Sequence, residues 1–186
     1  VNSTVAETSG LRERSTAAEG SLIAREELDL PASVIEERFA LRPDEGILNL
    51  FIGPVYGVDG RQGIYYTELY TNRDSLSLTS EVRLETLEAC GVPAYEVMAA
   101  RECHPYIARL IEGSILREYQ AHLIPWGGVE QVSDLYGGGV LLAGDAGKFT
   151  TEDGVGSWPA MASGKAAART VRHAREREDF SEETLS

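Results

Sequence analysis

A glycine-rich stretch at 137–164 holds the residues whose types and spacing best suit ligand binding. A short apolar run at 140–143 predicts a buried strand, because it is brief and bounded by glycines. Asp145 follows this run, and a carboxylate at the end of a strand suits hydrogen bonding to a polyol. The flanking glycines let the backbone approach a ligand closely. The predicted contact residues in this first half are Gly144, Asp145, Ala146 and Gly147.

The second half of the same stretch predicts a helix that begins beside the ligand. Ser157 and Pro159 are typical N-cap and first-turn residues, and small residues continue to about Arg177. A helix start presents free N–H groups and a positive dipole end, which favour an electron-rich ligand. A plain glycine-rich turn has the same local pattern, so the motif alone leaves both interpretations open. The predicted contact residues here are Gly154, Val155, Gly156 and Ser157.

The elements that must position this stretch are a sheet and several helices. Alternating β-branched and aromatic residues predict an antiparallel sheet, with Gly53-Pro54 ending one strand and Asp59-Gly60 forming a hairpin turn. A final strand and helix cannot form a sheet alone, so we expect them to complete a sheet in another layer. The predicted strands lie at 21–30, 47–52, 64–70, 75–84 and 114–124, and the predicted helices at 4–9, 31–39, 93–102 and 105–112.

Composition excludes several classes of function. The formal net charge is -13, and nucleic-acid binding requires a basic surface instead. Lysine occurs only at Lys148 and Lys165, and such an acidic, lysine-poor chain favours a high-salt proteome, where salt screens self-repulsion. An ordinary acidic protein is the alternative. No apolar run approaches about 18 residues, so no membrane span is predicted, and we expect a cytoplasmic protein.

Metal-binding and nucleophilic sites are not predicted. The three histidines are far apart in the sequence, and the two cysteines form no C-x-x-C pair. No Ser/His/Asp or Cys/His set has a convincing arrangement, so no catalytic side chain and no metal ligand is assigned. The histidines and cysteines are His104, His122, His173, Cys90 and Cys103.

A series of short motifs, in order along nearly the whole chain, resembles the electron-transfer-flavoprotein–quinone oxidoreductase family of the FixC type. This family belongs to a wider FAD-dependent group with geranylgeranyl reductases and aromatic hydroxylases. The matching motifs are Val1-Asn2-Ser3, Glu36-Glu37-Arg38, Glu45-Gly46, Ile52-Gly53, Tyr70-Thr71-Asn72, Asp74-Ser75, His104-Pro105, Glu118-Tyr119, Pro125, Gly127-Gly128, Gly144-Asp145-Ala146-Gly147, Ser163-Gly164, Ala166-Ala167 and Asp179-Phe180-Ser181.

The resemblance implies an α+β or α/β fold with three segments. Residues 1–20 end an FAD-domain segment, 21–136 form a domain like those that bind a quinone, and 137–186 return to a Rossmann-like FAD-binding domain. The implied function is electron transfer through FAD to a quinone, from an electron-transfer flavoprotein or a ferredoxin-like donor. A peripheral contact with the inner face of the cell membrane is left open. The alternatives are an isoprenoid-lipid (geranylgeranyl) reductase and a truncated, non-catalytic interaction module.

The resemblance also assigns roles within the glycine-rich stretch. Asp145 would bond the ribityl or pyrophosphate-proximal part of FAD, and the following helix start would face the N1–C2=O edge of the flavin, where a positive dipole end raises the flavin potential. Three departures border the flavin: a glycine replaces a second alanine at Gly147, Val155 replaces a basic residue, and Trp158-Pro159 replaces a Met-Asp pair.

The motif that binds the nucleotide part of FAD is not found in this sequence. No G-x-G-x-x-G follows a predicted strand, and the chain opens on Val1 without a methionine. We therefore expect the chain to be part of a longer protein, and to bind FAD weakly or not at all by itself.

Overall fold

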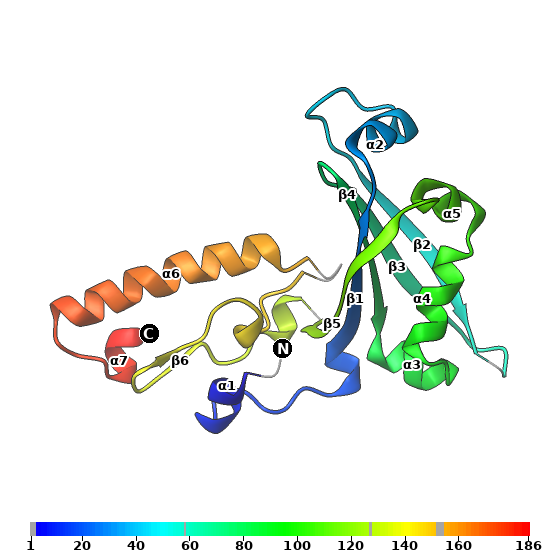
Figure 1. Ribbon diagram of the computed structural model, residues 1–186. Helices are drawn as coiled ribbons and strands as arrows, with labels where there is room; N and C mark the ends of the chain where they lie inside the picture. The colour runs from blue at the N-terminus through cyan, green and yellow to red at the C-terminus, as the bar shows by residue number, and fades with distance from the viewer. Residues whose placement is uncertain (1–2, 58, 127, 152–154) are drawn as a thin grey trace. The chain divides into compact units, whose positions relative to one another are not determined.

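The computed structural model describes residues 3–57, 59–126, 128–151 and 155–186 (Figure 1). The chain divides into two compact units, one made of 1–21 with 123–186 and the other of 22–122. The segment boundaries expected from the sequence, 1–20, 21–136 and 137–186, describe roles in a larger protein and stay a prediction. Among the described residues, no helix is long and apolar enough to cross a bilayer.

The unit formed by 22–122 is built on a five-stranded sheet with the order β2-β3-β4-β1-β5 (Figure 1). Antiparallel pairing joins β2 to β3 and β3 to β4, as the predicted hairpins require. The mixed fold with an antiparallel sheet and helices is confirmed. The strands are β1 (Gly20–Asp29), β2 (Leu48–Tyr56), β3 (Gln62–Thr71), β4 (Ser75–Arg83) and β5 (Ile115–Pro125).

Helices pack against one face of this sheet because the strands alternate apolar and polar residues. One core cluster joins Leu69, Leu76 and Leu78 of the sheet to Ile35 and Ile107 of two helices. A second, smaller cluster contains Val55, Val82, Cys90 and Val97. The helices of this unit are α2 (Ala32–Phe39), α3 (Leu84–Cys90), α4 (Ala94–Glu102) and α5 (Pro105–Ile111).

The predicted end of the second strand at Gly53-Pro54 is wrong. β2 continues to Tyr56, and Gly53 and Pro54 pair with Tyr65 and Ile64 of β3. β2 is an edge strand, and a proline on an edge strand costs no hydrogen bond to a further strand. The strand predicted at 75–84 is also one residue too long, since α3 begins at Leu84.

The unit formed by 1–21 and 123–186 contains short elements and one long helix, drawn in orange in Figure 1. Ser3 caps α1, because its hydroxyl accepts a hydrogen bond from the N–H of Ala6. The helical elements are α1 (Thr4–Thr8), η1 (Ala17–Glu19), η2 (Val129–Gln131), η3 (Gly144–Gly147), α6 (Ser157–Glu176) and α7 (Glu182–Leu185), and the strands are β6 (Tyr136–Gly137) and β7 (Val140–Leu141).

Candidate functional site

The apolar run before Asp145 does not form the predicted buried strand of a larger sheet. β7 has two residues, Val140 and Leu141, which pair with β6 in a small hairpin. The turn between them is shaped by Gly139, which has a φ of +77° and donates its N–H to the carbonyl of Phe180. One further bond, from the N–H of Leu142 to the carbonyl of Leu135, follows the paired residues, and the chain then enters the turn that begins at Gly144.

The Gly-Asp-Ala-Gly motif forms a single 3₁₀ turn, η3, instead of a strand end. Gly144 has a φ of +57°, a conformation that other residues rarely adopt. Its N–H donates to the hydroxyl of Ser163 on α6, at 3.0 Å, and thereby ties the turn to the helix. The turn closes with Lys148 in the left-handed conformation, its N–H bonded to the carbonyl of Asp145.

The N-cap of α6 lies one residue earlier in the chain than predicted. Gly156 occupies the N-cap position, Ser157 is already helical, and no side chain caps the first turn. The first turn also has no acidic residue, so the positive end of the helix is not neutralised by its own sequence. The N–H groups of Ser157 and Trp158 belong to the first turn, whose donors have no partner within the helix.

The carboxylate of Asp145 lies against the start of α6. A Cβ placed on Gly156 would be 3.4 Å from Oδ1 of Asp145 and 3.5 Å from the methyl group of Thr150. The Asp145 carboxylate therefore lies close to the N-cap residue of α6, at the distance of an ordinary van der Waals contact from such a Cβ. Asp145 is half-buried, and its carboxylate accepts no hydrogen bond from the part of the chain that the structure describes.

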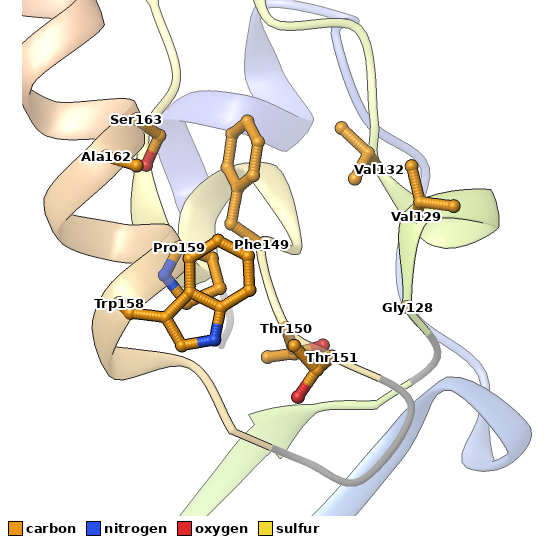
Figure 2. Close-up of a pocket in the computed structure, with 10 residues that line it drawn as sticks. All are labelled: Gly128, Val129, Val132, Phe149, Thr150, Thr151, Trp158, Pro159, Ala162 and Ser163. Atoms are coloured by element: carbon orange, nitrogen blue, oxygen red, sulfur yellow. The ribbon is translucent and has the colours of Figure 1, made fainter.

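A cavity of about 710 Å³ opens beside Thr150 and the start of α6. Figure 2 shows the indole of Trp158 and the rings of Pro159 and Phe149 close together, with Thr150 and Thr151 below them. Most of the lining is apolar, and two aromatic rings suit a flat ligand. The lining residues are Gly128, Val129, Val132, Phe149, Thr150, Thr151, Trp158, Pro159, Ala162 and Ser163.

The structure brings most of the predicted residues together. Gly144, Asp145, Ala146 and Gly147 form one turn, and Gly156 and Ser157 begin the helix beside it. Val155 is held by the hydroxyl of Thr151, which accepts its N–H at 3.0 Å. Gly154 lies outside the described residues. Ligand binding by these residues stays a prediction.

The cavity wall was missed from the sequence. Phe149 and Thr150 lie two and three residues after the motif, and an aromatic residue near a glycine turn is a usable signal. Val129 and Val132 have no such signal, because they lie 15 and 12 positions before Gly144 and only folding brings them to the cavity.

An ion pair holds the segment before β1 to the end of the turn. Nζ of Lys148 lies 3.0 Å from Oε1 of Glu19, and the lysine is 6% exposed. Glu19 also accepts the N–H and the hydroxyl of Thr16 in a capping box. The N–H of Thr16 and the bond from Lys148 lower the pKa of Glu19 below its ordinary value of 4.5.

This lowered pKa predicts how stability depends on pH. The Glu19 carboxylate stabilises the fold fully above pH 4.5, and its contribution is lost as the pH falls through the lower pKa of the folded state. We expect Glu19→Gln to reduce the free energy of unfolding by about 1 kcal/mol at neutral pH, and by progressively less in acid. Urea denaturation of both proteins across this range measures it. An equal difference at every pH would contradict the assignment.

Comparison with solved structures defines the class of fold. A geranylgeranyl bacteriochlorophyll reductase-like protein from Thermoplasma acidophilum superposes with a TM-score of 0.67 at 14% identity, over 95% of this chain and 40% of that one. The halogenase PltM, solved in complex with phloroglucinol and FAD, gives 0.57 at 13% identity, over 99% of this chain and 37% of that one. The fold is therefore similar to those of FAD-dependent oxidoreductases. No family model matches the chain.

Curated relatives narrow the class. Proteins named FixC match along the full length of the chain, at 38% identity in Salmonella typhi, 37% in Escherichia coli K12 and 34% in Azorhizobium caulinodans. The resemblance to FixC-type proteins, within the superfamily of FAD-dependent oxidoreductases, is thus confirmed. The chain spans 42–43% of the length of these relatives.

Proposed function

We propose that the chain is part of an FAD-dependent oxidoreductase, and that η3 and the start of α6 border the flavin. The single observation that carries this proposal is the position of Asp145 against the uncapped start of α6, beside the cavity. The full-length match to FixC proteins and the fold shared with an FAD-bound halogenase support it.

The residues present suit FAD. The carboxylate of Asp145 is an acceptor without an internal donor among the described residues, as a partner for ligand hydroxyl groups should be. The mostly apolar lining of the cavity, with Trp158 and Phe149, would pack against an aromatic ring system. FAD would supply the electron-transfer chemistry, as no side chain of this site needs to act as an acid or base.

Each part of the site then has one task. Asp145 would accept hydrogen bonds from the ribityl side of the cofactor and so fix its position along the turn. The N–H groups of Ser157 and Trp158, at the positive end of α6, would favour negative charge on the atoms that they face.

The electron acceptor that we propose is a quinone, and the donor an electron-transfer flavoprotein or a ferredoxin-like protein. One face of the β2–β3 hairpin is unusually apolar for an exposed surface, which suits a flat apolar molecule. A prenyl lipid would suit the same face, so an isoprenoid-lipid reductase is the alternative, and a reductase-like protein is among the structural neighbours. The exposed apolar residues of this face are Leu48, Leu50, Ile52, Tyr56 and Ile64.

The location that we propose for the protein is the cytoplasm. A peripheral contact with the inner face of the cell membrane would give it access to a quinone. In a high-salt cell, salt would screen the repulsion between the negative charges of this acidic chain.

The test uses the full-length gene product. We expect it to purify with bound FAD, and its flavin absorbance to bleach with a reduced donor and to recover on addition of a water-soluble quinone. Recovery with a prenyl lipid alone would favour the reductase, and a folded protein without flavin would favour the interaction module. Leu50→Arg should slow the quinone step without changing flavin content, whereas the control Glu88→Arg, an exposed residue on α3, should change neither.

A further inference from the structure

Arg12 is a buried cation that contacts the backbone of the Gly-Asp-Ala-Gly turn. Its side chain is 2% exposed, and its Nη1 lies 3.0 Å from the carbonyl oxygen of Ala146 and 3.4 Å from that of Asp145. Its Nη2 lies 3.5 Å from Oε1 of Glu7, on α1. One guanidinium therefore joins α1 to a turn that lies more than 130 residues further along the chain.

The bonds to two successive carbonyls fix the orientation of two peptide planes. Because a peptide unit is planar, the position of its carbonyl oxygen sets the direction of the rest of the unit. The peptide that follows Asp145 is one of the two, and its carbonyl also accepts the N–H of Lys148. The contact between Arg12 and these carbonyls thus sets the direction in which the Asp145 side chain leaves the backbone.

We propose that Arg12 is a positioning residue for FAD, which it serves by holding the Asp145 carboxylate against the start of α6. This inference rests on the proposed function. The Arg12 side chain is buried and its Nη1 faces the backbone of the turn, so it acts through the turn and not by touching the cofactor. The planar guanidinium directs Nη1 to the two carbonyls of the turn while Nη2 faces Glu7, and the single ammonium group of a lysine cannot reproduce this geometry.

A neighbouring buried cation provides a contrast. Lys148 is as buried as Arg12, but its ammonium group pairs with the side chain of Glu19 and not with a carbonyl of the turn. Burial of a positive charge near the motif is therefore shared by both residues, and the contact with the Asp145 and Ala146 carbonyls is the feature that singles out Arg12.

The test compares Arg12→Lys with Glu7→Gln in the full-length gene product. Arg12→Lys keeps the charge but not the fork, and we expect it to weaken FAD binding about tenfold and to alter the visible circular dichroism of the bound flavin. Glu7→Gln leaves the bonds to the turn in place and should change neither. If Arg12→Lys does not fold, Arg12→Gln replaces it, with the same expected results.

A double-mutant cycle separates positioning from a merely structural role. In protein that already carries Asp145→Ala, Arg12→Lys should cause little further loss of FAD affinity, because its effect passes through Asp145. Full additivity of the two losses would overturn the proposal, and so would an Arg12→Lys protein with unchanged affinity and dichroism. Wild-type protein without any flavin would instead reject the proposed function itself.

Discussion

Asp145→Ala is expected to weaken the binding of FAD to the full-length gene product by about 10- to 100-fold. Hydrogen bonds to a charged acceptor contribute about 1.5–3 kcal/mol, which corresponds to that range. The free energy of unfolding of the FAD-free protein should change little, because the described residues donate no hydrogen bond to this carboxylate. Titration of the apoprotein with FAD, followed by flavin fluorescence, measures the affinity.

Asp134→Ala is the matched control for this experiment. Asp134 is an exposed aspartate of the same unit, so its loss removes the same charge without touching the turn. We expect its FAD affinity to equal that of the wild type. Equal affinities for all three proteins would reject Asp145 as a flavin ligand, and equal losses in both variants would attribute the effect to net charge alone.

The second large effect is expected at Arg101, which is fully buried under the sheet of the other unit. Its Nη2 lies 2.8 Å from Oε2 of Glu26, and its Nη1 donates to the hydroxyl of Ser80 at 2.5 Å. Burial lowers the pKa of Arg101, and the nearby Glu26 carboxylate opposes that shift. Arg101→Ala should reduce the free energy of unfolding by about 3–5 kcal/mol, because it leaves a buried carboxylate without its partner.

Urea denaturation measures this loss, with Arg109→Ala as the control. Arg109 lies exposed on α5, so its removal should change the free energy of unfolding by no more than about 0.5 kcal/mol. The network also includes Thr67, whose hydroxyl lies 3.0 Å from that of Ser80. A loss of under about 1 kcal/mol at Arg101 would mean that Glu26 finds another partner or reaches water.

Local chemistry predicted the β2–β3 hairpin and most of the helices, because their signals lie within a few residues, whereas α3 was not predicted. Asp59-Gly60 gave the turn between β2 and β3, and Pro105 gave the first turn of α5. The errors lie where tertiary contacts decide. β2 passes through Gly53-Pro54 because it is an edge strand, and β7 is short because the chain turns into η3 at Gly144.

The candidate site likewise has one part that the sequence predicts and another part that only the fold reveals. The motif at 144–147 and the following helix start could be found from residue types, and the resemblance to FixC-type proteins added FAD to the prediction. Arg12 could not be found, because its contact with Ala146 spans 134 positions in the sequence. The cavity beside Trp158 likewise depends on Val129 and Val132, which only the fold brings near.

A crystal structure of the full-length gene product with FAD tests the central claim most directly. We predict that the Asp145 carboxylate lies within hydrogen-bonding distance, about 2.5–3.0 Å, of a hydroxyl group of the cofactor, with the start of α6 facing the flavin ring. A structure in which FAD is bound elsewhere, and neither 144–147 nor the start of α6 contacts it, would contradict the account.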